Sequence, residues 1–422
     1  MKIPALLIFI AVYAVMIGLS KYRVFAALCG ALLFLLTGIE PVTALPQTLN
    51  FNVLLMIGGM MITVYYFIES KMPMRIADTL LRISGNLCMV TIYLSLFAGL
   101  ISAFIDNVAT VLMIAPVGIA IAKKRNVSPV PMIISIAVSS NLQGAATLVG
   151  DTTSILLGQY AHMTFMDFFF MDGRPGIFWA VELGALATVP VMLILFRNMK
   201  EPVSAEEKTK VEDLVPTAML LLTIAVLIGA SFFKNRPAMT NGIVCMGFAL
   251  VCMAHSHIKT GGGQQNLGCL KEMDWETLVL LASLFVVVDG ITQAGLIEDI
   301  AGIIARLGGR SYFLLYTIIV WFSVLISAFV DNIPYVTTML PVIAGIASVM
   351  DISPNLLYYG LLTGATLGGN LTPIGASANI TGIGILRNNG YQVENRQFMK
   401  ISVPFTLVAV TVGYVFLWIF WR

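Results

Sequence analysis

The sequence predicts an all-α polytopic membrane protein built from two repeats that lie inverted in the bilayer. Three observations support this prediction. Of the 422 residues, 58% are hydrophobic and only 11% are charged, whereas a soluble domain usually has about 25% charged residues. Many apolar runs approach the ~20 residues that a helix needs to cross a bilayer. Finally, the pattern SAF-x-DN occurs twice, once in each half of the chain.

The repeated pattern is sixteen residues long and returns after 225 positions. Residues 102–117 read SAFIDNVATVLMIAPV and residues 327–342 read SAFVDNIPYVTTMLPV, with eight of the sixteen positions identical. Three pairs of residues further along the chain match at the same offset: Gly144 with Gly369, Thr147 with Thr372, and Gly150 with Gly375. An apolar chain with two related halves and a polar site in each is typical of secondary transporters.

Five crossings are expected in each half. In the first half they lie near residues 4–20, 24–40, 51–69, 130–161 and 178–196. In the second half they lie near residues 216–233, 239–254, 277–296, 356–386 and 403–421. Because five is odd, the second half enters the membrane from the opposite side, and the repeats are inverted. This divides the chain into a first repeat at 1–196, a cytoplasmic linker at 197–215 and a second repeat at 216–422.

A re-entrant hairpin is expected between the third and fourth crossings of each half. An amphipathic stretch (71–85 and 297–310) precedes a two-armed apolar segment (86–122 and 311–350), and the SAF-x-DN pattern lies at the middle of that segment. Irregular backbone at mid-membrane is tolerated only where protein or water surrounds it. We therefore expect each hairpin tip to be enclosed by protein or reached by water.

The basic residues predict the orientation. The expected crossings place 17 of the 24 Lys and Arg residues on one side and seven on the other, namely Lys2, Arg174, Lys234, Arg236, Arg306, Arg310 and Arg422. Loops rich in Lys and Arg face the cytoplasm. Both termini are therefore expected outside a prokaryotic plasma membrane. The charged linker and the GGGQQ run at 261–265 are expected to be solvated and flexible.

Two of the expected crossings are interrupted by polar and small residues. Residues 139–154 read SSNLQGAATLVGDTTS and residues 363–379 read TGATLGGNLTPIGASAN. Glycines allow the backbone to unwind, and Pro373 removes a hydrogen-bond donor. Unwound carbonyls, hydroxyls and amide oxygens suit a hard cation. The candidate site residues in these stretches are Ser139, Ser140, Asn141, Thr147, Gly150, Asp151, Thr152, Asn370, Thr372, Gly375, Ser377 and Asn379.

Asp106 and Asp331 lie at the two hairpin tips, where a charge at membrane depth costs at least about 2.5–3.5 kcal/mol. Each aspartate precedes the second arm of its hairpin, which is a good N-cap position. Ser or Asn would cap the arm equally well without the cost of a charge. We therefore expect both aspartates to bind a cation or carry a proton, and Na⁺ binding would involve Asn107 and Asn332 beside them.

Three further acids lie within crossings and have no acidic counterpart in the other half. Asp151 matches Ala376, so it either adds a titratable group to one side of the site or caps its half-helix. Asp289 and Glu182 are expected near a helix interface.

The tip motifs FIDNVATVLMIAPV and FVDNIPYVTTMLPV, together with GGNLTPIGASANI, resemble the ion transporter superfamily over nearly the whole chain. That group includes arsenite permeases, NhaD-type sodium/proton antiporters, the melanosomal P-protein type and the divalent-anion/sodium symporters. The resemblance implies a homodimer in which a transport domain moves against a scaffold domain as an elevator. It also implies that the site is lined by Asn107, Asn332, Thr147, Gly150, Thr372, Gly375 and Asn379.

The hairpin tips separate two branches of this superfamily. The symporter branch carries Ser-Asn-Thr at its tips. The matching residues here are Asp106-Asn107-Val108 and Asp331-Asn332-Ile333, which is the pattern of the arsenite, NhaD and P-protein branch.

These features predict a secondary transporter of a small inorganic ion or weak acid, coupled to Na⁺ or H⁺. Arsenite-type efflux and sodium/proton antiport both remain open. The alternative is a sodium-coupled symporter of citrate or dicarboxylates, which the two tip carboxylates would repel unless cations compensate. An ion channel is less favoured, because hairpins entering from both sides block a continuous pore. Neither an enzymatic activity, a cofactor nor a nucleic-acid partner is expected.

Overall fold

The computed structural model describes residues 1–203, 209–233, 236–261, 264–308 and 311–422. Within these ranges the chain is almost entirely helical, and the sheet consists of β1 (Phe170–Met171) paired with β2 (Arg174–Pro175). Lys208, Lys234 and Arg310, which entered the charge count, and the glycines at 262–263 lie outside the described residues.

Helices follow the order of the expected elements closely. In the first half they are α1 (Lys2–Gly18), α2 (Arg23–Leu36), α3 (Leu45–Thr48), α4 (Phe51–Glu69), α5 (Met72–Ile83), α6 (Leu87–Ser102), α7 (Asn107–Arg125), α8 (Val130–Gly144), α9 (Thr152–Tyr160) and α10 (Ile177–Phe196). In the second half they are α11 (Val215–Ser231), α12 (Thr240–Thr260), α13 (Gln264–Glu272), α14 (Trp275–Gln293), α15 (Leu296–Gly308), α16 (Tyr312–Ser327), α17 (Asn332–Met350), α18 (Asn355–Gly368), α19 (Ser377–Asn388) and α20 (Asn395–Trp421).

The two halves contain the same series of elements around the repeated motif. Helices α6 and α7 correspond to α16 and α17, with every boundary displaced by 225 residues. The crossing after each hairpin is broken, because α8 ends at Gly144 and α9 begins at Thr152, while α18 ends at Gly368 and α19 begins at Ser377. The first break consists of turns and bends, and the second contains a short 3-10 helix at Gly369–Leu371 followed by turns and bends.

Among the described residues, seven helices are long and apolar enough to cross a membrane: α4, α7, α10, α12, α14, α17 and α20. Helices α1, α2 and α11, which were expected to cross, are 14 to 17 residues long. Helices α7 and α17, which were expected to be hairpin arms, have 19 residues each and are long and apolar enough to cross a membrane. The number of ten crossings therefore stays a prediction.

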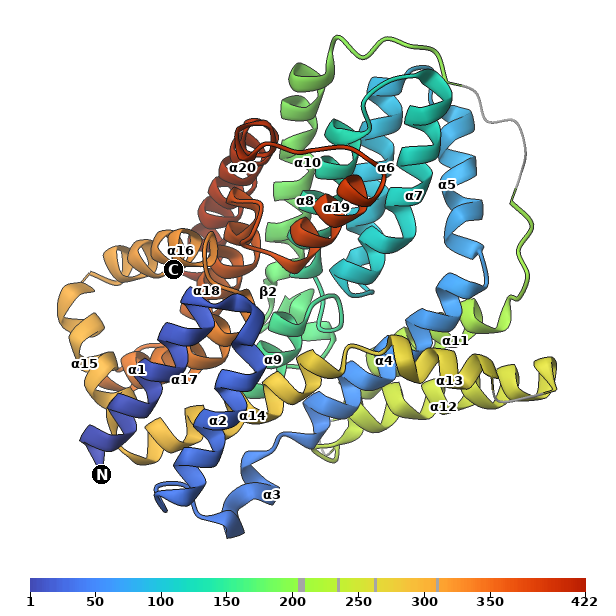
Figure 1. Cartoon of the computed structure of the whole chain (residues 1–422). Coiled ribbons are helices and arrows are strands. Elements are labelled where there is room, and N and C mark those ends of the chain that lie inside the picture. The colour runs from blue at the N-terminus through green and yellow to red at the C-terminus, as the bar shows by residue number, and fades with distance from the viewer. Residues whose placement is uncertain (204–208, 234–235, 262–263, 309–310) are drawn as a thin grey trace.

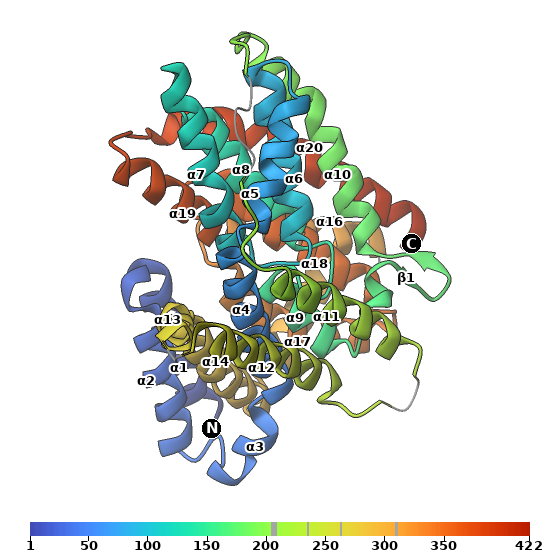
Figure 2. The same cartoon turned by 90° about the vertical axis from the view of Figure 1, so that its right-hand side faces the viewer.

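Two groups of helices build the molecule (Figure 1). The base group, α1–α4 and α11–α14, lies below the hairpin group, α6–α8, α10, α16 and α18–α20, and Figure 2 shows the same separation from a second side. Within the base group α4 packs on α12 and α2 on α14, and within the hairpin group α6 packs on α8 and α16 on α18. Helices α9 and α17 lie where the groups meet, since α9 contacts α4 and α17 contacts α14.

The described residues of the linker between the halves are exposed or half-buried, and hydrogen bonds attach the linker to neighbouring helices on both sides of its middle. The carbonyl of Glu201 accepts a 2.9 Å hydrogen bond from the Leu87 amide at the start of α6. The amide of Thr209 donates to the Asp78 carboxylate of α5 at 2.7 Å. Residues 204–208 of the linker lie outside the described part of the chain.

Candidate functional site

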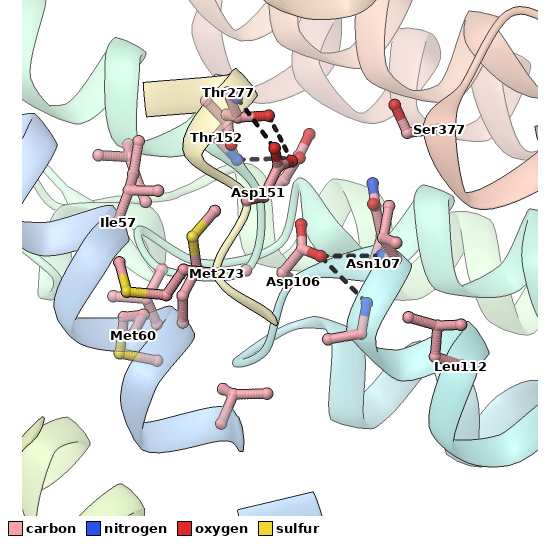
Figure 3. A pocket seen from close by; sticks show the side chains of 18 of the residues that line it. Ile57, Met60, Asp106, Asn107, Leu112, Asp151, Thr152, Met273, Thr277 and Ser377 are labelled. Atoms are coloured by element: carbon pink, nitrogen blue, oxygen red, sulfur yellow. Dashed lines mark hydrogen bonds between the residues drawn. The ribbon is translucent and has the colours of Figure 1, made fainter. Parts of the chain in front are cut away.

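A cavity of about 220 Å³ lies where the base group meets the hairpin group. Helix α4 supplies an apolar wall that includes Ile57 and Met60, and the start of α7 supplies a polar wall with Asp106 and Asn107. Figure 3 shows Asp106 and Asp151 between these two walls. The cavity thus joins the first hairpin tip, the break before α9 and the base group.

Nine of the sixteen predicted site residues line this cavity, and they are Asp106, Asn107, Asn141, Gly150, Asp151, Thr152, Asp331, Asn332 and Ser377. The remaining seven are buried and are not part of its lining: Ser139, Ser140, Thr147, Asn370, Thr372, Gly375 and Asn379. The sequence pattern therefore predicts residues that gather around one cavity, and about half of the predicted side chains lie behind the lining rather than in it.

Both tip aspartates cap the helix that follows them. One carboxylate oxygen of Asp106 accepts hydrogen bonds from the amides of Val108 and Ala109 at 3.0 and 3.1 Å. The Asp331 carboxylate accepts from the Ile333 amide at 3.0 Å. Capping places each negative charge at the positive end of a helix, which stabilises the ionised carboxylate.

Gly150 and Gly375 hold the broken segments against the hairpin tips. A Cβ atom on Gly150 would stand 2.6 Å from the carbonyl oxygens of Ala103 and Gly144 and 2.7 Å from that of Ser102. At Gly375 the corresponding distances are 2.5 Å to the Gly369 carbonyl and 2.8 Å to each of two tip carbonyls. Three carbonyl oxygens thus converge at each tip, and only glycine leaves room for them.

The tips are tied to the breaks by matching hydrogen bonds. The Thr147 hydroxyl donates to the Ala103 carbonyl, and the Thr372 hydroxyl donates to the Ala328 carbonyl. These two bonds join equivalent positions of the two halves. The loop geometry of the repeat is therefore the same at both tips.

Amide side chains connect the first tip to the second half of the chain. Asn107 donates to the Asn141 amide oxygen at 3.1 Å. The Asn141 nitrogen in turn donates to the Thr366 carbonyl at 2.7 Å and to the Asn370 amide oxygen at 3.1 Å. Because these groups are buried, the network specifies their arrangement strongly.

Asp151 belongs to the same network. Its two carboxylate oxygens accept from the Thr152 amide at 2.9 Å and from the Thr153 hydroxyl at 2.6 Å. The Thr153 hydroxyl also lies 2.9 Å from the hydroxyl of Thr366. Asp151 therefore caps α9 and also contributes an acid to the cavity.

The charged lining of the cavity is entirely acidic. Five carboxyl groups line it, from Asp106, Asp151, Glu272, Asp274 and Asp331, and no Lys, Arg or His is among its described lining residues. One of the five, Asp331, is paired with Arg23 of α2. An anion entering this space alone would meet strong repulsion, whereas a cation would be attracted.

Two buried oxygens beside the breaks lack a partner among the described residues, although buried polar atoms are normally hydrogen-bonded. They are Oγ of Ser102 at the first tip and Oδ1 of Asn379 in α19. The equivalent of Ser102 is Ser327, whose hydroxyl bonds to the Asn332 amide oxygen and the Ala365 carbonyl. The first tip therefore has a hydroxyl group without a partner among the described residues, whereas the hydroxyl of the second tip donates within the protein.

Several residues of the site were not predicted. Asp274, Thr277 and Glu272 approach the cavity from the junction of α13 and α14. Asp274 caps α14, accepting from the Thr277 amide at 3.0 Å. The spacing of an acid three residues before Thr277 is a recognisable cap signal, but nothing local indicates that this helix start faces a hairpin tip. In the sequence, Arg23 served only to predict which side of the membrane the loops face.

The two other acids that were singled out lie elsewhere. Asp289 lines a second cavity of about 320 Å³, between α14 and α17. The side-chain nitrogen of Gln293 donates to the Asp289 carboxylate at 2.8 Å and to the carboxylate of the buried Glu40 at 2.7 Å. Glu182 lies in α10 outside both linings, and its Oε1 atom has no partner among the described residues.

Comparison with protein families identifies one match over most of the chain. Residues 5–364 match the family model CitMHS, described as citrate transporter. A relative in Mycobacterium tuberculosis, the uncharacterized transporter Rv2684, is 28% identical over 99% of this chain and 98% of its own length. The human P protein is 27% identical over 96% of this chain, which spans 58% of that relative.

Two solved transporter structures share the fold. The Alcanivorax borkumensis YdaH transporter superposes with a TM-score of 0.61 at 15% identity, covering 89% of this chain and 87% of its own. Neisseria gonorrhoeae MtrF, described as illuminating a class of antimetabolite efflux pumps, superposes with a TM-score of 0.57 at 13% identity, covering 98% of this chain and 94% of its own.

Proposed function

Because this chain belongs to the citrate transporter family CitMHS and is an integral membrane transporter, we propose that it is a secondary active transporter driven by a cation bound at its acidic cavity. The family match and the P protein relative also confirm the resemblance to the ion transporter superfamily. Its coupling ion and its substrate are proposed below.

One observation favours a cation as the ion that binds in the cavity. Five carboxyl groups and no basic residue are found among the described lining residues of the cavity. Two of them, Asp106 and Asp331, are the repeated tip acids, and Ser102 leaves an acceptor free beside three converging carbonyls. Oxygen ligands of this kind suit Na⁺, and a carboxylate of the same set would carry H⁺. The transported solute is then a small inorganic ion or weak acid, by arsenite-type efflux or sodium/proton antiport.

An elevator movement of an inverted repeat is proposed as the mechanism. The two groups of helices meet at the cavity, and α9 and α17, which lie between them, would move with the hairpin group. The cavity reaches Ile68 and Glu272, next to Lys71 and Lys271 of the Lys-rich side. The conformation is then open to the cytoplasm, with the base group as the scaffold of a homodimer.

Replacement of the tip acids tests the proposal. Asp106→Asn and Asp331→Asn keep the shape and the capping ability of each side chain but remove its charge. In proteoliposomes each variant should lose the dependence of uptake on a Na⁺ or H⁺ gradient, while the protein remains folded. Asp299→Asn is the matched control, because Asp299 is an exposed acid paired with Lys2 outside the cavity. Gradient-dependent uptake by both tip variants at the level of this control would refute the assignment.

A second candidate is favoured by the family match, since CitMHS is described as a citrate transporter family. Citrate would enter an acidic cavity only if its charge were balanced by bound cations. Uptake of radioactive citrate with and without Na⁺ and Mg²⁺ separates the candidates. Citrate uptake that requires one of these cations supports the second candidate, and absence of citrate uptake in all conditions rules it out.

A further inference from the structure

Arg23 and Asp331 form an ion pair between the two groups of helices. Arg23 is the first residue of α2 in the base group, and Asp331 is the tip acid of the second hairpin. The guanidinium Nη1 contacts Oδ2 of Asp331, and the side chains are 25% and 23% exposed. The other oxygen, Oδ1, caps α17. Both oxygens of this tip acid are therefore occupied within the protein.

The position of Arg23 indicates that the pair is more than a chance surface contact. A positive charge in the first turn of a helix is unfavourable, because it adds to the positive end of the helix dipole. Asp331 compensates the charge of Arg23, and at the same time α17 places its own positive end at Asp331. Separation of the two groups would leave Arg23 uncompensated.

A second contact joins the same surfaces. The Tyr13 hydroxyl of α1 donates to the Pro334 carbonyl at 3.0 Å and is also hydrogen-bonded to the Thr338 hydroxyl. Asp331, Pro334 and Thr338 are spaced by three and four residues, so they share one face of α17. The α1–α2 pair thus holds the second hairpin at its tip and one turn beyond it.

The base group presents a negative charge, rather than a positive one, to the first hairpin tip. Asp274, at the start of α14, lines the same cavity as Asp106 and brings a second carboxyl group to it. No ion pair joins Asp106 to a residue that the structure describes. The base group therefore neutralises one tip and leaves the other available to a cation.

We propose that Arg23 is a latch that holds the second hairpin against the base group in the cavity-open conformation and competes with the coupling cation for Asp331. This inference rests on the proposed function, because the latch matters only if the two groups move past one another. A contact made in one conformation and absent from the other stabilises the first. Cation binding at Asp331 would displace Arg23 and release the hairpin group.

The latch is tested by the accessibility of the cavity. Leu112, which lines the cavity and is 52% exposed, is replaced by Cys, and its labelling by an impermeant maleimide is followed in inside-out vesicles. Site-resolved mass spectrometry separates this label from the native cysteines. Arg23→Gln should slow labelling about fivefold, a typical magnitude for coupling between two states. Arg23→Lys should restore the rate at least in part, because it keeps the charge.

Controls separate the latch from other effects. Lys2→Gln removes the exposed pair with Asp299, 55% exposed on both sides, and should leave the labelling rate unchanged. Asp331→Asn should slow labelling as Arg23→Gln does, and the double variant should be no slower than either single variant. Labelling of Arg23→Gln at the unsubstituted rate would overturn the latch. This readout needs no transport, so gradient-dependent uptake by the tip variants would refute the proposed function without deciding the latch.

Discussion

The side-chain amide of Asn141 donates a 2.7 Å hydrogen bond to the backbone carbonyl of Thr366, and these residues occupy equivalent positions 225 residues apart. When two copies of a unit are related by a two-fold axis, equivalent residues meet only at that axis. In the inverted repeat that we propose, this contact would lie on the axis, between α8 and α18 and next to the two broken segments. The proposed site would then lie where both halves meet.

Removal of this contact should destabilise the protein. Asn141→Ala leaves the Asn107 amide, the Asn370 amide oxygen and the Thr366 carbonyl without a buried partner, at a cost of roughly 2–4 kcal/mol. The melting temperature in detergent should fall by several degrees. Ser135→Ala is the control, because Ser135 is equally buried on α8 but bonds only to the Pro131 carbonyl of its own helix. Equal melting temperatures for the two variants would contradict an axial role for Asn141.

Gly150→Ala should disrupt the first tip. The new Cβ would stand 2.6 Å from two carbonyl oxygens, so the backbone must shift at a cost of roughly 1–3 kcal/mol. Uptake in proteoliposomes should fall at least about tenfold, since a small displacement of positioning groups costs that much or more. Gly229→Ala in α11 is the matched control, because a Cβ there meets nothing within 4 Å. Uptake by Gly150→Ala equal to that control would argue against a tight tip.

The positions of the helices were largely predictable, because the hydrophobic pattern and its repeat determine them. The third crossing was expected at 51–69, and α4 covers Phe51–Glu69. Helix α13 was missed, because a GGGQQ run resembles a linker, and yet Gln264 begins a helix that packs near α4. Packing against a neighbouring helix overrides local propensity there.

The composition of the site was predictable only in part. The pattern around Asp106 marks a polar residue at membrane depth, which is an unusual and informative position. Asp274 and Arg23 carry no such mark, because they lie at the starts of α14 and α2, and charged residues are common at the ends of helices. Their approach to the tips depends on how the base group packs on the hairpin group, and the order of residues in the chain does not specify this.

Labelling at the end of the first hairpin tests the orientation. Lys124→Cys lies in the last turn of α7, on the side that carries most of the Lys and Arg residues. An impermeant thiol reagent should label it in inside-out vesicles but not in intact cells. Labelling in intact cells would show that the side rich in basic residues faces outward.

The linker should show a pH-dependent attachment through Asp213. Burial raises the pKa of Asp213, but hydrogen bonds from Lys259, the Val215 amide and His255 lower it further, to about 2. A lowered pKa contributes stability that is complete above the unfolded value of 3.8 and is lost as the pH falls toward about 2. Asp213→Asn should therefore lower the free energy of unfolding by about 1 kcal/mol at pH 6. The melting temperature should fall with it. The difference should shrink below pH 4, and a constant difference would contradict this assignment.

Calorimetry of dicarboxylate binding is the most direct test of an acidic, cation-binding site. Two unit charges ~6 Å apart interact by roughly 3 kcal/mol at an effective dielectric constant near 20, so a tip carboxylate would weaken dianion binding by about two decades. Purified protein titrated with succinate at neutral pH, without Na⁺ or Mg²⁺, should show no micromolar binding. Micromolar succinate binding under these conditions would contradict the account and place the chain with the anion symporters.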